Sequence, residues 1–313
     1  MALLVCWAGS GEWLAQLDTA DLELHGGPTV RAAKACLSAR GLGSRFRLRL
    51  LREETTEEME EDETLLLPCS VKLVVLSLLP ADVEEDHEFV QLCSEGRLEE
   101  VEGRLFRPQE PNSENKDGWN ALQMAAWTGR AAVARILLEA KACCNHERRA
   151  RGTTPLHAAA WNEHLEVLRV LLEARASSDP IMVDKGTTPL HLAAWNGQSE
   201  AARLLLEAKA ACNQAMTDGA TPLHLAAETG HEAVVRLLLE ARASCTPCRE
   251  AGRTPFHLAA QKGHLEVVRL LLETGAFNPT GTDAASVLGL VPEKGRGEVL
   301  RHLLEARASF ADG

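Results

Sequence analysis

Residues 154–160 read TPLHAAA, and the motif returns as TPLHLAA at 188–194, TPLHLAA at 221–227 and TPFHLAA at 254–260. The histidines of the four copies are 34, 33 and 33 residues apart. A leucine-rich block follows each copy, as in LEVLRVLLEARA at 165–176. Self-similarity with a fixed period of about 20–50 residues is typical of repeat proteins. The sequence therefore predicts a row of similar units that stack on one another.

Each unit reads as two short helices joined by a turn. Threonine is a favoured N-cap residue, and proline is favoured at the first helical position. The four Thr-Pro pairs that predict a first helix are Thr154 and Pro155, Thr188 and Pro189, Thr221 and Pro222, and Thr254 and Pro255. The leucine-rich blocks place apolar residues at i, i+3, i+4 and i+7, which predicts an amphipathic second helix. Gly-His pairs such as Gly230 and His231 predict the turn between the two helices.

This pattern resembles the ankyrin-repeat family, in which T-P-L-H-x-A-A is followed by G-H and then by V-V-x-L-L-L-E. The resemblance gives five repeats at 117–283, an acidic link with a degenerate capping repeat at 81–116, and a degenerate C-terminal capping repeat at 284–313. Degenerate end units are expected because an end repeat presents one face to water. The resemblance implies an α-solenoid of helix-turn-helix units with projecting β-turn fingers. It also implies recognition of a protein partner and no catalytic activity.

One histidine recurs in each complete motif, at His157, His191, His224 and His257. Stacked helices pack about 10 Å apart, whereas zinc ligands lie about 2.0–2.3 Å from one ion. We therefore expect these histidines to be structural and predict no metal site. The family resemblance implies that each bonds to the threonine before it and to neighbouring turns.

Residues 1–80 predict a separate α+β domain. Segments 2–8 and 11–17 flank Gly-Ser-Gly and read as a hairpin, 28–40 as a helix, and 45–52 and 71–79 as strands. Eight acidic residues in 53–63 predict a solvated loop. This order resembles ubiquitin and other β-grasp proteins. The alternative to a binding role is a domain that caps or stabilises the repeat array. Two features depart from ubiquitin: the last strand lacks a Gly-Gly end, and the strand at 45–52 carries Arg45, Arg47 and Arg49.

Charge and hydropathy exclude several classes of function. Residues 1–115 hold 23 acidic and 11 basic residues, against 22 of each in 116–313, so a general nucleic-acid surface is not expected. No apolar run reaches the length of a membrane span, and the N-terminus does not resemble a signal peptide. The nine cysteines show no disulfide spacing. These features predict an intracellular protein, in the cytoplasm in preference to the nucleus.

The sequence offers no recognisable catalytic arrangement or cofactor motif. The nucleophile-elbow, phosphate-loop and dinucleotide-binding patterns are all missing. Cys245 and Cys248 form one CxxC pair without a second pair to complete a metal site. A thiol chemistry there would need a depressed thiol pKa. We therefore predict no enzyme and no cofactor.

The tryptophans of the repeats are the strongest candidates for binding residues. Trp127, Trp161 and Trp195 follow the Ala-Ala of successive repeats and are 34 residues apart, and Trp119 precedes the first motif. The family resemblance places these positions on the concave face, where partners bind. The predicted polar rim consists of Thr128, Thr153, Asn162, Lys185, Thr187 and Asn196. The alternative is a ladder of tryptophans that pack on each other and only stiffen the stack.

The helix ends carry a second periodic feature. The family has glycine in the LLLEAGA segment, and this chain keeps it at Gly275. The other units carry a basic residue there, at Lys141, Arg175, Lys209, Arg242 and Arg307. A cation at a helix C-terminus is favourable by about 0.3–1 kcal/mol. The row is interpreted as dipole compensation on a solvated edge or, alternatively, as a basic docking stripe.

Two functional hypotheses follow. In the first, the chain is a non-enzymatic scaffold or adaptor that binds a protein or peptide on the concave face. In the second, it is a protein-turnover adaptor, in which the ubiquitin-like domain recruits a ubiquitin-pathway protein and the repeats select a substrate.

Overall fold

The computed structural model describes residues 2–7, 13–25, 29–39, 48–52, 58–60, 65, 69–75, 83–106, 110–148, 151–246, 252–274, 291, 296–297 and 299–301. They fall into two compact units. One comprises Met1–Leu122 with Ala132–Cys143, and the other comprises Gln123–Ala131 with Cys144–Gly313.

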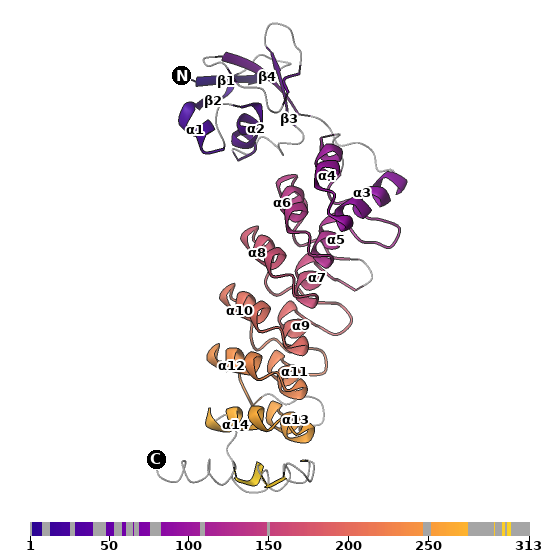
Figure 1. Ribbon diagram of the computed structural model, residues 1–313, viewed down its shortest axis with the longest axis vertical. Coiled ribbons are helices and arrows are strands. Elements are labelled where there is room, and N and C mark those ends of the chain that lie inside the picture. The colour runs from indigo at the N-terminus through magenta and orange to yellow at the C-terminus, as the bar shows by residue number, and fades with distance from the viewer. Residues whose placement is uncertain are drawn as a thin grey trace. The chain divides into compact units, whose positions relative to one another are not determined.

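The first unit begins with a four-stranded mixed sheet (Figure 1). Its strands are β1 (Ala2–Trp7), β2 (Trp13–Asp18), β3 (Leu48–Arg52) and β4 (Cys69–Val75), in the order β2-β1-β4-β3. The pairs β1–β2 and β3–β4 are antiparallel, whereas β1 and β4 are parallel. The predicted hairpin of the first two strands is therefore confirmed.

Helix α1 (Thr19–Glu23) contacts β2, and helix α2 (Val30–Ala39) contacts β2 and β3. Helix α1 had not been predicted. The core is formed by apolar side chains from α2 and from alternate positions of the strands, since alternate residues of a strand share one face. Examples are Leu37 on α2, Leu48 and Leu50 on β3 and Leu73 on β4, all with no exposed surface. Met59 is also buried, although it lies in the segment predicted to be a solvated loop. Arg45, Arg47 and most of that acidic segment lie outside the described residues.

The remaining elements are helices arranged in pairs along the chain (Figure 1). They are α3 (Val83–Glu95) and α4 (Leu98–Leu105), α5 (Ala121–Trp127) and α6 (Ala131–Glu139), α7 (Pro155–Trp161) and α8 (Leu165–Glu173), α9 (Pro189–Asn196) and α10 (Ser199–Glu207), α11 (Pro222–Thr229) and α12 (Glu232–Glu240), and α13 (Pro255–Lys262) and α14 (Leu265–Glu273). In the second unit, the first helices α7, α9, α11 and α13 contact one another in this order, and so do the second helices α8, α10, α12 and α14. The predicted two-helix repeats are therefore confirmed.

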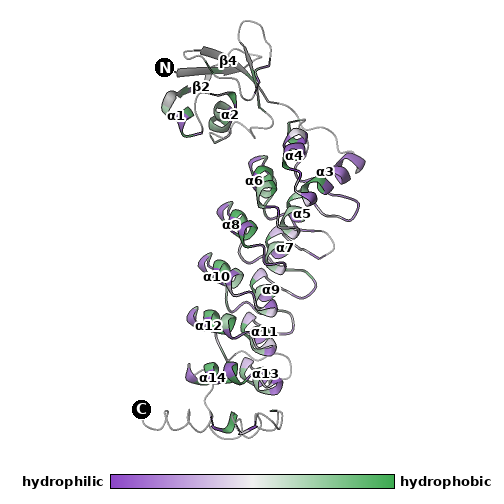
Figure 2. Cartoon of the chain, viewed as in Figure 1, coloured by the Kyte–Doolittle hydropathy of each residue, from purple (hydrophilic) through white to green (hydrophobic). Residues whose placement is uncertain are grey.

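Small and apolar side chains explain why the pairs stack. The Ala-Ala step of each motif is fully buried, as at Ala193 and Ala194, so neighbouring first helices can approach closely. The second helices bury leucine and valine on one side only, as at Leu168 and Leu171 of α8. Figure 2 shows the green hydrophobic residues of α8, α10 and α12 on the side toward the first helices. Within the second unit, the core is thus continuous from repeat to repeat.

The loops between repeats are also tied together. Backbone hydrogen bonds join successive hairpin fingers, from Val183 N–H to Arg151 O over 3.0 Å and from Thr217 N–H to Lys185 O over 3.0 Å. A side-chain oxygen caps the loop of the following repeat, as when Asn213 Oδ1 accepts from Ser244 N–H at 2.7 Å. These bonds fix neighbouring repeats of the second unit relative to one another.

The ends of the predicted array differ in part from expectation. Residues 83–86 had been predicted as part of a link but form the start of α3, where Asp86 is buried. The degenerate unit after them does contain a helix pair, α3 and α4. Most of 284–313, including Arg307, lies outside the described residues. None of the helices in the described part is both long enough and apolar enough to span a membrane.

Candidate protein-binding face

The TPLH motifs fix where each first helix begins. Thr188 has an extended backbone (φ −104°, ψ 166°) and is the N-cap of α9, with Pro189 next to it. Its backbone N–H donates to His191 Nδ1 over 3.2 Å, and its hydroxyl lies 2.8 Å from the same nitrogen. The same reciprocal capping occurs in α7, α11 and α13. In every complete motif the helix therefore begins at the proline that follows the capping threonine.

The other ring nitrogen of the histidine reaches the next repeat. His157 Nε2 donates to Thr187 O at 3.0 Å, and His191 Nε2 donates to Ala220 O at 3.2 Å. Burial lowers the pKa of both histidines from 6.5 to about 4, so they are neutral near neutral pH. No group of three or more metal-ligating side chains occurs among the described residues. The bonds from His157 to Thr187 and from His191 to Ala220 show that these two histidines connect successive repeats.

Three tryptophans lie at the carboxyl ends of first helices with much of their surface in water. Trp127 is 40% exposed, and Trp161 and Trp195 are each 45% exposed. Their backbone carbonyls, in contrast, bond to the following repeat: Trp161 O accepts from Asn196 Nδ2 at 3.2 Å and from Gln198 Nε2 at 3.0 Å. The backbone at each tryptophan is thus held while the indole faces solvent.

The repeat region matches known family profiles. A profile described as ankyrin repeats in three copies matches residues 89–184, 146–215 and 177–247, and a single ankyrin-repeat profile matches 251–284. The chain is an ankyrin-repeat protein. A search of curated proteins found no match. Ankyrin repeats are protein-interaction modules and are generally non-enzymatic, so protein partners are expected.

The polar residues predicted to surround the tryptophans of this ankyrin array have different roles. The Asn196 amide is engaged with Trp161 O as described, and Asn162 Nδ2 donates to Trp127 O at 3.1 Å. The Thr128 hydroxyl donates to Met124 O at 2.8 Å. These three side chains therefore hold the first helices and their neighbours in place.

The predicted rim residues in the hairpin fingers differ from one another in exposure. Lys185 is exposed, whereas Thr153 is half-buried. Thr187 is buried, and its carbonyl accepts the bond from His157, so its predicted place on the rim is wrong. Trp119 is half-buried, and its backbone N–H donates to Asn115 Oδ1 at 2.9 Å. Among the described residues, the large exposed aromatic side chains are Trp127, Trp161 and Trp195, which we call the tryptophan column.

The turn after each tryptophan is tightly packed. The carbonyl of Trp195 accepts from His231 Nε2 at 3.1 Å, and the His231 ring lies against Gly197, which has φ 75°. A Cβ atom on Gly197 would lie 2.5 Å from His231 Nδ1. Glycine is therefore required here both by its backbone conformation and by the ring of the next repeat.

We predict that Gly197→Ala lowers the unfolding free energy by about 1–2 kcal/mol from the positive φ alone. The displaced His231 ring adds to this loss. The double variant Gly197→Ala/His231→Gln should recover part of it, because the clash is removed. Urea unfolding of the three proteins measures the effect. Equal stability of the wild type and Gly197→Ala would contradict this packing.

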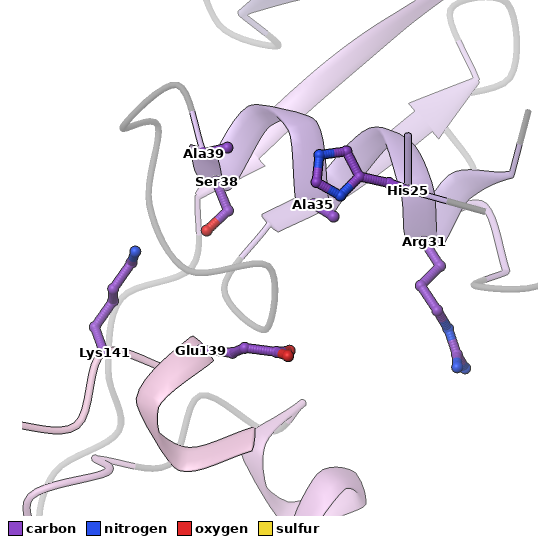
Figure 3. A pocket seen from close by; sticks show the side chains of 7 residues that line it. All are labelled: His25, Arg31, Ala35, Ser38, Ala39, Glu139 and Lys141. Atoms are coloured by element: carbon purple, nitrogen blue, oxygen red, sulfur yellow. The ribbon is translucent and has the colours of Figure 1, made fainter. Parts of the chain in front are cut away.

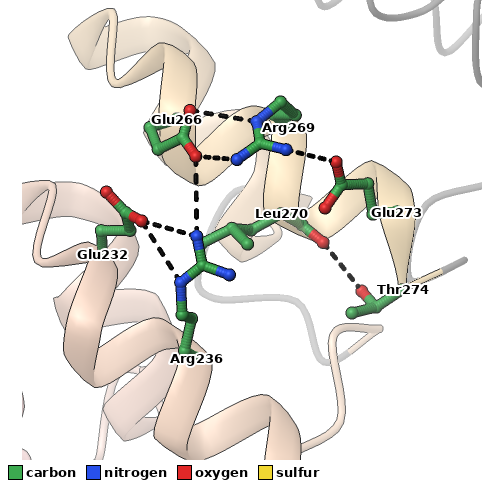
Figure 4. Close-up of polar contacts among 7 residues, drawn as sticks. All are labelled: Glu232, Arg236, Glu266, Arg269, Leu270, Glu273 and Thr274. Atoms are coloured by element: carbon green, nitrogen blue, oxygen red, sulfur yellow. Dashed lines mark hydrogen bonds and ion pairs between the residues drawn. The ribbon is translucent and has the colours of Figure 1, made fainter.

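The second helices carry charged side chains that pair mostly with each other. Arg236 Nη2 lies 2.7 Å from Glu232 Oε1 and 3.6 Å from Glu266 Oε1. Figure 4 shows these contacts and Arg269 between Glu266 and Glu273. Exposed pairs of this kind contribute about 0–1 kcal/mol each. The charges of Arg236 and Arg269 on this exposed surface are thus paired within it.

The predicted basic row at the helix ends has a left-handed backbone where it is described. Lys141, Arg175, Lys209 and Arg242 have φ of 69°, 60°, 69° and 60°. All four side chains are exposed. Gly275 and Arg307 lie outside the described residues, so four of the six positions are described.

Neither candidate for small-molecule chemistry gains support. The pocket in Figure 3 is lined by His25, Arg31, Ala35, Ser38, Ala39, Glu139 and Lys141. In this view the side chains of Arg31 and Lys141 point away from each other instead of converging on one point. Burial raises the pKa of Cys245 to about 11, which is opposite to the shift that a reactive thiol needs, and Cys248 lies outside the described residues.

Proposed function

We propose that the chain is a non-enzymatic scaffold or adaptor that binds a protein or peptide through the tryptophan column. The observation that carries this proposal is the exposure of three large aromatic side chains, at 40%, 45% and 45%, on successive repeats. Aromatic side chains bury about 150–250 Å² each, and tryptophan is enriched among the residues that dominate binding energy.

The packing around the column supports this proposal over a purely structural ladder. Among the described residues, no aromatic contact joins Trp161 to Trp195. The bonds that connect the repeats use the carbonyls of the tryptophans and leave the rings of these two residues available. A preformed surface of this kind loses little conformational entropy when a partner binds.

The N-terminal domain gives the second hypothesis its basis. Hairpin, helix and two further strands with a parallel pairing of β1 and β4 support the proposed ubiquitin-like domain at 1–80. In that case the domain would recruit a ubiquitin-pathway protein while the repeats select a substrate. We propose an intracellular location because several cysteines, such as Cys143 and Cys212, are free thiols.

Affinity capture from native lysate tests the main proposal. The baits are the full wild-type chain and Trp127→Ala/Trp161→Ala/Trp195→Ala, with folding compared by circular dichroism. We expect specific proteins that the wild type captures and that the folded triple variant loses. Identical sets of captured proteins would remove the tryptophan column from the binding surface.

A further inference from the structure

One residue beside the tryptophan column departs from the pattern of the other repeats. The first helices of four repeats are followed by glycine with positive φ, at Gly129, Gly197, Gly230 and Gly263. The remaining repeat has Glu163 at this position, with φ 57°. Because a left-handed backbone costs a residue other than glycine roughly 1–2 kcal/mol, this glutamate is unfavourable for stability.

A second substitution in the next repeat accommodates Glu163. At Gly129, Gly197 and Gly230, a histidine ring of the following repeat packs on the glycine, and an added Cβ atom would lie 2.7 Å, 2.5 Å and 2.5 Å from that ring. The repeat after Glu163 has Gln198 instead of this histidine. Gln198 Nε2 donates to Trp161 O at 3.0 Å, so it replaces the histidine's hydrogen bond without its ring. The two changes form a matched pair.

The matched pair removes the clash but keeps the backbone strain. Backbone strain of this kind clusters at functional sites. The Glu163 side chain is exposed, and no ion-pair or hydrogen-bond partner for it occurs among the described residues. It lies two residues after Trp161, on the turn against which the repeat of Trp195 packs through Asn196 and Gln198. The exposed carboxylate and the exposed Trp161 indole thus lie two residues apart in the chain, at the end of one first helix.

The repeat after the tryptophan column carries a carboxylate at the tryptophan position. The position held by Trp127, Trp161 and Trp195 is occupied in the next repeat by Glu228, which is half-buried. Trp195 thus lies between a repeat that carries Glu163 and a repeat that carries Glu228. Aromatic faces attract cations, and carboxylates form strong charge-assisted hydrogen bonds with them.

We infer that the tryptophan column binds a partner segment through a lysine or arginine side chain, held against Trp161 and Trp195 with Glu163 as its counter-charge. This inference rests on the proposed function and specifies the chemistry of the partner. The aromatic rings supply apolar contact and cation–π attraction, and Glu163 supplies the charge that selects a basic segment over a neutral one.

Selection from a random twelve-residue peptide display library tests this inference. The full-length wild type and the triple tryptophan variant serve as parallel targets. Peptides enriched only on the wild type are sequenced, and one is synthesised for titration by fluorescence anisotropy. We expect a lysine or arginine at a common position in these peptides.

The variants separate charge from fold. Glu163→Gln should weaken binding of the synthesised peptide about tenfold, an effect that shrinks as salt rises. Replacing the peptide's lysine or arginine by glutamine should cost a similar factor, and the double change should be clearly non-additive. Glu240→Gln on α12 is the matched control, because Glu240 is also exposed, and should bind like the wild type. Glu163→Gly should lose the same affinity while melting at a higher temperature, since the strain is relieved.

Each alternative outcome is decisive. The inference would be overturned if the tryptophan-dependent peptides shared no lysine or arginine. It would also be overturned if the affinity losses from Glu163→Gln and from the peptide substitution were additive. In both cases the proposed function stands. A library that yields no tryptophan-dependent peptide would count against both.

Discussion

Lowering the pH from about 7 to about 4 is expected to remove about 3 kcal/mol of stability for each of His157 and His191. Burial lowers the folded-state pKa of each to about 4, whereas the unfolded chain has the ordinary value of 6.5. The stability is therefore fully present above pH 6.5 and is lost as the pH falls toward 4. In this window the unfolded state binds more protons than the folded state does.

The hydrogen bonds explain why the folded histidines resist protonation. Nε2 donates to a carbonyl of the next repeat, so Nδ1 is the acceptor for the N–H of Thr154 or Thr188. A proton on Nδ1 would face that N–H group and place a charge in a buried site. Acid should therefore loosen both the helix start and the contact between repeats.

Glutamine already replaces the motif histidine in the first repeat, so a histidine-to-glutamine variant is a suitable control. Gln123 holds the histidine position of the first repeat, is buried, and donates through Nε2 to His146 O at 2.9 Å and Thr153 O at 3.0 Å. We expect His157→Gln/His191→Gln to fold and to have a much flatter stability profile between pH 6.5 and 4. Urea unfolding at a series of pH values measures both proteins. Parallel profiles would show that these histidines do not control acid stability.

Replacing either Trp161 or Trp195 by alanine is expected to weaken partner binding by about thirtyfold or more. Loss of a central aromatic contact residue commonly costs about 2 kcal/mol, and about 1.4 kcal/mol corresponds to a factor of ten. Calorimetric titration of a partner recovered by affinity capture measures the loss. Melting temperatures should change little, because the indole rings are 45% exposed in the free protein.

Leu98→Ala on α4 is the control for this second prediction. Leu98 is also an exposed apolar residue, at 36%, but lies outside the tryptophan column. It should bind with wild-type affinity. Equal losses for Leu98→Ala and Trp161→Ala would indicate a general effect of surface hydrophobicity and would contradict a specific site.

The array could be predicted from sequence because its determinants are local. Thr188, Pro189 and His191 act within one helical turn, and the leucine spacing of α10 defines its buried side. The basic residues at the helix ends were found by comparing copies of one motif. The same comparison would have found Glu163 and Gln198. The segment WNEH at 161–164 has glutamate where the other copies have glycine, and WNGQ at 195–198 has glutamine where ETGH at 228–231 and QKGH at 261–264 have histidine.

Other features depended on contacts that one copy of the motif does not specify. Thr187 was expected on the rim because of its place in the finger, but the His157 ring of the preceding repeat binds its carbonyl and the residue is buried. Helix α1 is only five residues long and lacks a periodic pattern. The start of α3 contains so many acidic residues that it resembled a linker, although Asp86 is buried once the helix forms.

Oxidative footprinting of the tryptophans, with and without a captured partner, tests the central claim most directly. Side-chain oxidation is measured at each tryptophan by peptide mass spectrometry on the full chain. We predict that saturating partner strongly protects Trp161 and Trp195. Unchanged oxidation at both, with protection confined to the charged second helices α8, α10, α12 and α14, would contradict binding through the tryptophan column.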